Sequence, residues 1–154
     1  MHVKSALQVF NQSDVPTSPG VIEGIILRKL AGTTEHPSER INVNLAILAA
    51  GTHEHLHFHL IETFHYVVAG RAIVRDIEGN RYEVGPGDVV SGPPGIRGAH
   101  EWEILETLHL LTVKGTNAPE RAIQFSIDPE TRECTADLDY LLDRGVGDMK
   151  ESFY

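Results

Sequence analysis

The chain has 154 residues, of which 41% are hydrophobic, and a formal net charge of −9 with the histidines neutral. This length and composition predict one folded domain, 1–154, with a buried core, and they exclude a disordered chain. The acidic balance without any basic cluster argues against nucleic-acid binding. No apolar run is long enough for a membrane span, no signal peptide is evident, and the single cysteine fits a reducing compartment. We therefore expect a cytoplasmic protein with no membrane partner.

The predicted elements are almost all strands. Two prolines and the lack of any regular period mark residues 1–20 as an N-terminal arm, with a short strand near Ala6–Phe10. A C-terminal extension over 128–154 contains the one segment with helical spacing of its leucines, Ala136–Arg144. The remaining segments are aliphatic or alternating runs bounded by glycine and proline, and they predict strands over Val21–Gly32, Ile41–Ala50, Arg71–Ile77, Arg81–Val84, Val89–Ser91, Leu108–Lys114 and Ala122–Ile127. Many short strands with regularly spaced turns predict a β-sandwich or barrel.

A histidine-rich block lies between Gly51 and Gly70. Alternate residues of a strand point to one face, so histidines at every second position predict a column of imidazoles on that face. Histidine is the commonest protein ligand of transition metals, and the block therefore predicts a metal site on a β scaffold. A solvated strand without metal is the alternative, but the apolar run that follows, with a bend at Gly70, favours a folded core. The alternating histidines are His53, His55, His57 and His59.

Two motifs in this region resemble those of the cupin superfamily. The first cupin motif, G-x5-H-x-H-x3/4-E-x6-G, is matched by Gly51, by His57-Phe58-His59 after five residues, and by the ending Tyr66–Gly70. The second, G-x5-P-x-G-x2-H, is matched by Gly87 and, after five residues, by Pro93-Pro94-Gly95. Both motifs stand in the family's order and at its separation.

The resemblance covers about 41–113, which would be the cupin core of the domain. It implies an all-β fold, a double-stranded β-helix or jelly-roll barrel that is open at one end and holds a metal inside. It also implies a homodimer in which the N-terminal arm lies along the partner's sheet edge, where it would protect that edge from uncontrolled pairing.

The chain departs from both motifs in the same way. The family's glutamate position falls on Thr63 and its second-motif histidine position on Gly98, yet His65 and His100 each lie two residues further on. A two-residue step along a strand keeps the same face, so both imidazoles would still point into the barrel. The resemblance together with this shift predicts a ligand set of His57, His59, His65 and His100.

Glu62 is the alternative fourth ligand. It would serve if the histidine pair of the motif were His55 and His57, although the spacing of the two glycines counts against that register. In the favoured register, His53 and His55 share the face of the ligand pair and lie at the barrel mouth or behind the ligands. His109, in a closing strand, is expected to be a core histidine.

A neutral, all-histidine site favours one divalent transition metal ion, Fe, Ni, Cu or Zn, over the ions that prefer oxygen ligands. The resemblance implies a metal-dependent enzyme acting on a small oxygenated organic molecule, either a dioxygenase or a cyclase or isomerase of polyketide type. A non-catalytic cupin that binds a small ligand as a sensor or carrier is the alternative, and a purely structural metal is a third hypothesis. Candidate substrate contacts are Tyr66, Arg71, Arg97 and Trp102.

Overall fold

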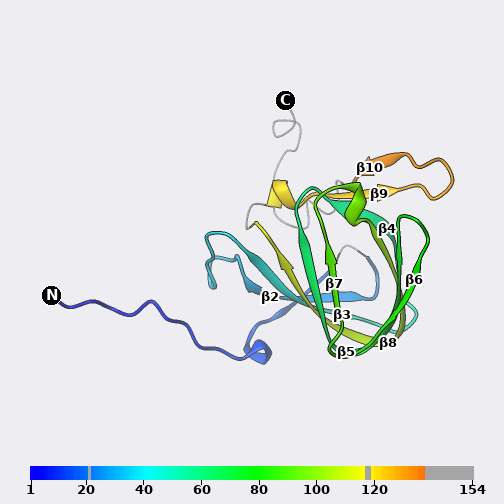
Figure 1. Ribbon diagram of the computed structural model, residues 1–154. Helices are drawn as coiled ribbons and strands as arrows, with labels where there is room; N and C mark the ends of the chain where they lie inside the picture. The colour runs from blue at the N-terminus through cyan, green and yellow to red at the C-terminus, as the bar shows by residue number, and fades with distance from the viewer. Residues whose placement is uncertain (21, 117–118, 138–154) are drawn as a thin grey trace.

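Figure 1 shows the computed structural model of the chain, which describes residues 1–20, 22–116 and 119–137. The described residues form ten strands in one antiparallel sheet, and their only helical segments are the short 3-10 turns η1 (Gln12–Asp14), η2 (Ile96–Gly98) and η3 (Pro119–Ala122). The predicted all-β fold, a double-stranded β-helix, is confirmed. No helix among the described residues is long and apolar enough to cross a membrane.

Eight of the ten strands contain segments that were expected as strands. The short strands Thr17–Pro19 and Cys134–Ala136 are not among them, and the strand expected over Leu108–Lys114 begins already at His100. Most strands begin or end within a few residues of the glycines and prolines that bound the runs in the sequence. Their bounds are β1 Thr17–Pro19, β2 Ile25–Ala31, β3 Asn42–Leu48, β4 His53–His59, β5 Thr63–Asp76, β6 Arg81–Val84, β7 Val89–Gly92, β8 His100–Lys114, β9 Gln124–Ile127 and β10 Cys134–Ala136.

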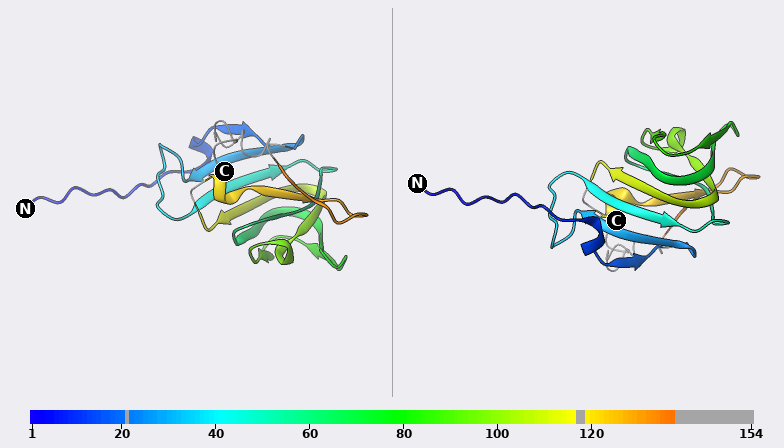
Figure 2. Two further views of the ribbon diagram at one scale, coloured as in Figure 1. Left: turned by 90° about the horizontal axis from the view of Figure 1, so that it is seen from above. Right: turned by 90° about the horizontal axis from the view of Figure 1, so that it is seen from below.

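Strand β8 is the central strand of the barrel and pairs with three other strands. One edge pairs with β5 along nearly its whole length, from Asp76 opposite His100 to Thr63 opposite Lys114. Its other edge pairs with β3 over its second half and with β4 near its start. On one side the sheet continues from β3 to β2 and β1, and on the other from β4 to β9 and β10. The strands lie lengthwise across the two views of Figure 2, where the sheet curves over on itself.

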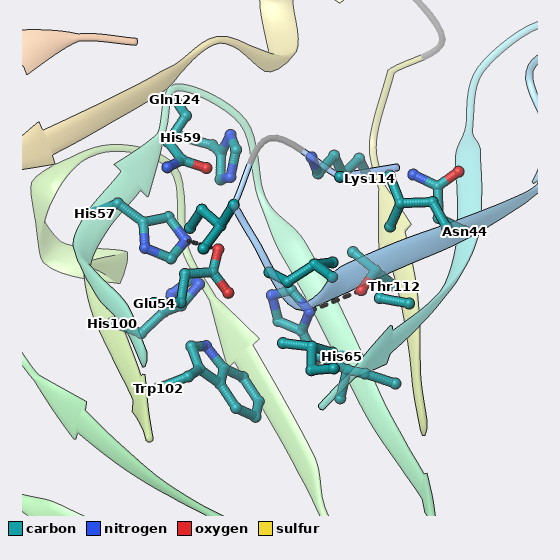
Figure 3. A pocket seen from close by; sticks show the side chains of 17 residues that line it. Asn44, Glu54, His57, His59, His65, His100, Trp102, Thr112, Lys114 and Gln124 are labelled. Carbon is teal, nitrogen blue, oxygen red and sulfur yellow. Dashed lines mark hydrogen bonds and ion pairs between the residues drawn. The ribbon is translucent and has the colours of Figure 1, made fainter. Parts of the chain in front are cut away.

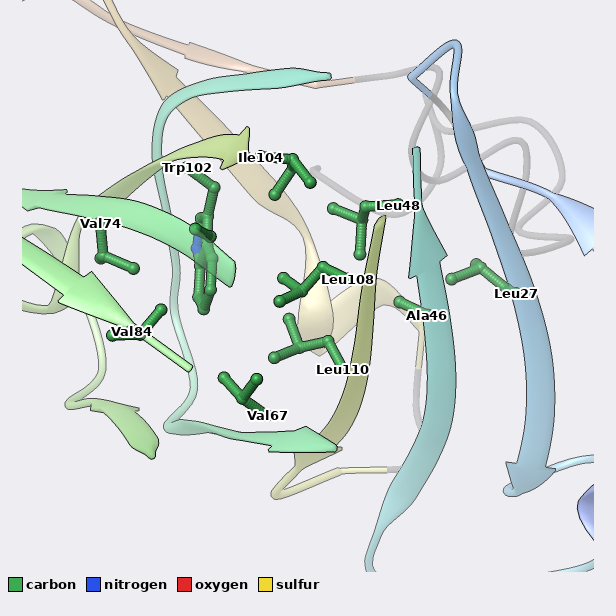
Figure 4. Close-up of a cluster of buried hydrophobic side chains, with 11 residues drawn as sticks. Leu27, Ala46, Leu48, Val67, Val74, Val84, Trp102, Ile104, Leu108 and Leu110 are labelled. Carbon is green, nitrogen blue, oxygen red and sulfur yellow. The ribbon is translucent and has the colours of Figure 1, made fainter. Parts of the chain in front are cut away.

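The core fills one part of the barrel interior. Along β5 and β8, buried and exposed residues alternate, as expected for strands with one face inward. Trp102, Val67 and Leu108 are almost completely buried at the centre of this cluster. Figure 4 shows the cluster, which comprises Leu27, Ala46, Leu48, Val67, Ala72, Val74, Val84, Trp102, Ile104, Leu108 and Leu110.

Three further expectations for the elements differ from the structure or lie outside it. Residues Ala6–Phe10 form no strand; they are exposed in an arm that extends away from the barrel (Figure 1). The segments before and after Gly70, expected as two strands with a bend between them, form the single strand β5, which runs through Gly70 with a shift of register against β8. The helix expected over Ala136–Arg144 lies outside the described residues from 138 onward, and Ala136 itself belongs to β10.

Candidate metal centre

A cavity of about 100 Å³ lies inside the barrel beside the hydrophobic core. Strands β2 and β3 provide mostly apolar walls, whereas β4, β5, β8 and β9 contribute polar side chains (Figure 3). One water needs roughly 10–15 Å³ of such volume, so the cavity can hold several waters or one small molecule. The polar lining residues are Asn44, Glu54, His57, His59, His65, His100, Thr112, Lys114 and Gln124.

A β-bulge in β4 decides which of its side chains enter the cavity. Glu54 is opposite Trp102 and His57 is opposite His100, so three steps along β4 match two along β8. The extra residue reverses the side-chain parity within β4. Glu54 therefore points inward together with His57, while His53 and His55 are exposed.

This corrects the expectation that His53 and His55 share the face of the ligand pair. His53 lies 3.3 Å from Glu101 at the surface, and His55 bonds to Ser126. His109, expected in the core, is only partly buried and alternates with the inward residues of β8.

The structure brings the four predicted imidazoles to the same cavity. All four are buried, two on β4, one on β5 and one at the start of β8. The ring of His100 lies between two others, with centroids 4.5 Å from His57 and 5.2 Å from His65. His59 is 5.8 Å from His57, centroid to centroid.

Main-chain carbonyls fix the tautomer of three of these rings. A carbonyl can only accept a hydrogen bond, so each Nδ1 carries the proton and each Nε2 keeps its lone pair. Metal-binding histidines are held in this way, with the second ring nitrogen donating to a carbonyl or carboxylate. Nδ1 donates to the main-chain oxygen of another residue in each case: His57 to His55 (2.7 Å), His59 to Ala122 (2.8 Å) and His100 to Gly98 (2.9 Å).

His65 is held differently. Its Nδ1 lies 3.1 Å from the hydroxyl of Thr112, and its Nε2 is buried without a hydrogen-bond partner. A buried polar atom without a partner costs free energy, and such atoms in folded proteins call for an explanation. A ligand in the cavity would satisfy this nitrogen.

Burial keeps the imidazoles neutral. Desolvation lowers the pKa of His57 and of His100 to about 4, and it lowers the pKa of His59 and of His65 well below the ordinary value. A neutral imidazole is the form that binds metal. All four rings are therefore in the protonation state that binds a cation at neutral pH.

Glu54 is the functional candidate that the sequence analysis missed. Its Oε1 lies 3.3 Å from Nε2 of His57, and burial raises the pKa of its carboxyl group. The residue lies one position before the expected inward face, and only the bulge brings it inside. Leu56 and Phe58 are buried on the opposite face of β4, so both faces of its second half are buried. The strand therefore has no simple alternation of buried and exposed residues from which the bulge could be located.

The donor set fits a divalent transition ion in its chemistry. It consists of neutral imidazoles with oriented rings, one of them with an unsatisfied nitrogen, and a carboxyl group beside them. Among the described residues, no three His, Cys, Asp or Glu side chains are already arranged to hold a metal ion. Binding would therefore need side-chain rotation at the cavity.

The expected substrate contacts do not gather at one place. Trp102 lines the cavity, with its ring 5.5 Å from that of His65. Tyr66 and Arg71 are exposed on the outward face of β5, where Arg71 pairs with Glu83. Arg97, in η2, lines a second and more open hollow formed with β5, β6 and β7.

The rival ligand Glu62 is also outside the cavity. It is exposed just before β5, next to Gly115, whereas Thr63 and His65 are buried. The cavity contains further polar residues that the sequence motifs did not indicate, namely Asn44, Thr112, Lys114 and Gln124.

Comparison with known proteins agrees with this architecture. Residues 44–114 match the family model of the cupin domain. This match agrees with the fold of the barrel. No curated protein matches the sequence.

Solved structures share this cupin fold. The polyketide cyclase RemF from Streptomyces resistomycificus is 23% identical, with a TM-score of 0.62 over 70% of this chain and 78% of that chain. The DMSP lyase DddQ from Ruegeria pomeroyi DSS-3 is 17% identical, with a TM-score of 0.61 over 77% of this chain and 64% of that chain.

Oxalate decarboxylase from Bacillus subtilis is 24% identical, with a TM-score of 0.61. The match covers 81% of this chain but only 33% of that one, so this chain spans about a third of the decarboxylase. The decarboxylase from Bacillus subtilis has Mn(II) centres. The fold of this chain is thus one that enzymes with different chemistries share.

Proposed function

We propose that this cupin is a metal-dependent enzyme that moves a proton on a small oxygenated organic molecule. The observation that carries the proposal is the pairing, inside one cavity, of a partly buried carboxyl group with neutral, oriented imidazoles. Of the two enzyme classes that the sequence suggested, this pairing favours a cyclase or isomerase, because such reactions need a positioned acid or base.

His57, His59, His65 and His100 would hold the ion. When bound, a divalent ion there polarises a carbonyl or enolate oxygen of the substrate. Iron, nickel, copper and zinc suit imidazole ligands. Manganese joins the candidates, because Glu54 adds an oxygen donor beside the site and the similar oxalate decarboxylase has Mn(II) centres.

Glu54 would hold and deliver the proton. Without an ion, the carbonyl of His55 keeps the proton of His57 on Nδ1, so Nε2 accepts and the carboxyl of Glu54 is the donor of this pair. An ion held by Nε2 would take the place of this hydrogen bond and leave the carboxyl group of Glu54 free to meet the substrate. Burial favours the protonated form of that carboxyl. A carboxylic acid kept neutral by an apolar site can give its proton to a substrate and then take one back.

The walls of the cavity would position the substrate. Trp102 and the aliphatic residues of β2 and β3 would keep water from the carboxyl group while a substrate fills the cavity, which would strengthen polar interactions inside. The volume restricts the substrate to a small molecule.

Proton exchange at carbon tests the proposal. The untagged protein is incubated in D2O with small ketones, hydroxy acids and β-dicarbonyl compounds, and the loss of C–H signals is followed by NMR. We expect catalysed exchange in the wild type, and a rate reduced about 10²-fold or more in Glu54→Gln, the range for removal of a general acid or base. Glu62→Gln, which changes an exposed carboxylate, is the matched control and should exchange as the wild type does.

The alternatives give different results. Oxygen consumption with an iron-loaded protein would support a dioxygenase instead. Ligand binding without exchange or oxygen uptake would support the non-catalytic sensor or carrier.

A further inference from the structure

Lys114 is a buried cation in the same cavity. It is the last residue of β8, it is only 5% exposed, and it lines the cavity with the four imidazoles. Lysine is buried to this degree in folded proteins almost only when it is paired, since removing an ammonium group from water is costly. An ammonium group has three donors, so one that lines a hollow can bind an anion there in addition to its other contacts.

The cation and the carboxyl group lie on different sides of the cavity. Glu54 is opposite Trp102 near the start of β8, whereas Lys114 ends that strand. Figure 3 shows Lys114 beside Asn44, with Glu54 and His57 across the cavity. A bound molecule could therefore meet the ammonium group with one end and the carboxyl group with the other.

Neutral hydrogen-bonding groups line the hollow near Lys114. Asn44, Thr112 and Gln124 are all buried and all line the cavity. Amide and hydroxyl groups donate hydrogen bonds to oxygen without adding negative charge that would repel an anion. The charge of Lys114 also acts on the four imidazoles and on Glu54, lowering the pKa of each, as expected for one charge acting across a shared cavity.

We propose that Lys114, assisted by Asn44 and Gln124, binds the carboxylate of the substrate, so that the substrate is a small carboxylic acid with a carbonyl or hydroxyl group near its acid group. This rests on the proposed function, which places the reacting carbon beside Glu54. The cavity supplies a positive site inside a chain whose net charge is −9.

The only tryptophan of the chain reports on binding. Trp102 lines the cavity, so its fluorescence measures occupancy without any need for turnover. The protein as purified is titrated with pyruvate and with methyl pyruvate, which differ in the negative charge. We expect pyruvate to bind at least about 10-fold more tightly, the range for one hydrogen bond to a charged group.

Lys114→Met removes the charge and keeps the apolar stem. Its Kd for pyruvate should rise about 10-fold or more, by the same reasoning, while its Kd for methyl pyruvate changes little. Lys4→Met, an exposed lysine in the arm, is the control and should bind both as the wild type does. Equal binding of the two compounds by the wild type, or unchanged pyruvate binding in a folded Lys114→Met protein, would overturn the subsite.

The two proposals can fail separately. If metal content and Glu54-dependent exchange hold but Lys114→Met binds pyruvate normally, only the subsite is wrong. If Lys114→Met loses pyruvate binding but Glu54→Gln exchanges protons as fast as the wild type, the subsite stands and the proposed function fails. If Lys114→Met does not fold, the comparison of pyruvate with methyl pyruvate on the wild type decides.

Discussion

Oε1 of Glu54 lies 3.3 Å from Nε2 of His57, although the two residues are three positions apart on one strand. In a regular strand they would point to opposite faces. The bulge between them in β4 brings both to the cavity and leaves His53 and His55 outside. One inserted residue thus places a carboxyl group beside the imidazoles.

The role of His65 is tested against that of Glu62. His65→Ala should weaken metal binding about 10-fold or more, as loss of a ligand or even of a residue that orients one does. Glu62→Gln should keep its metal content, because Glu62 is exposed outside the cavity. Metal content is measured by elemental analysis after dialysis against a weak chelator. The reverse result would mean that Glu62 is the fourth ligand after all.

Stability should fall as the pH falls. The pKa of His57 and of His100 is about 4 in the folded protein and 6.5 in a model peptide, so the unfolded chain binds more protons between these values. The stabilisation is therefore complete above pH 6.5 and is lost down to about pH 4. Glu54, whose pKa is raised, acts in the opposite direction above its model value of 4.5.

Denaturant unfolding of the metal-free protein from about pH 7 to about pH 4 measures this effect. His57→Gln should show a shallower loss than the wild type, whereas His53→Gln, at an exposed position, should follow the wild type. Equal slopes in all three proteins would contradict the burial of a neutral His57. Because the folded pKa values are so low, protons should compete with metal near pH 4 and not near the ordinary histidine value of 6.5.

Gly70 permits the close approach of β5 and β8. Its φ is +89°, and a Cβ there would clash with the carbonyl oxygen of Thr107. Gly79 has a similar φ of +86° but open space around it, so it isolates the cost of the backbone conformation. We expect Gly79→Ala to lower the free energy of unfolding by roughly 1–2 kcal/mol and Gly70→Ala to lower it by clearly more. Equal losses in denaturant titrations would show that the two strands do not approach so closely.

The N-terminal arm is expected to make a homodimer. Val3, Leu7 and Val9 expose apolar side chains on an arm that extends from the barrel. A second copy of the chain could cover them along a sheet edge. Light scattering at micromolar concentration should find a dimer for the wild type and a monomer for Leu7→Asp combined with Val9→Asp. A monomeric wild type would remove the idea.

The fold was predictable because its signals are local and repeated. Glycines and prolines bound the strands, and the two cupin motifs fixed the barrel around 41–113. The inward face of β5 also followed from parity, since Thr63, His65 and Val67 are all buried. The alternation of faces along a strand gave the wrong inward residues in the first half of β4, where a bulge shifts the register. That register depends on pairing with β8, which the sequence of β4 alone does not show.

The site was predictable only for its histidines. Lys114 and Asn44 reach the cavity from strands far apart in the sequence, and no motif marks them. Arg71, which directly follows the first cupin motif, was a candidate substrate contact. It lies outside, since the register shift of β5 near Gly70 leaves it paired with Glu83 at the surface.

The central claim is that His57, His59 and His100 hold a metal ion inside the barrel. Elemental analysis of untagged protein, compared with His100→Ala and His53→Ala, tests it most directly. We predict about one divalent transition ion per chain in the wild type and in His53→Ala, because His53 is exposed outside the cavity. His100→Ala should lose most of its metal while its far-ultraviolet circular dichroism stays that of a folded β protein. Full occupancy in His100→Ala, or a wild type that binds no metal when supplied with it, would contradict the account.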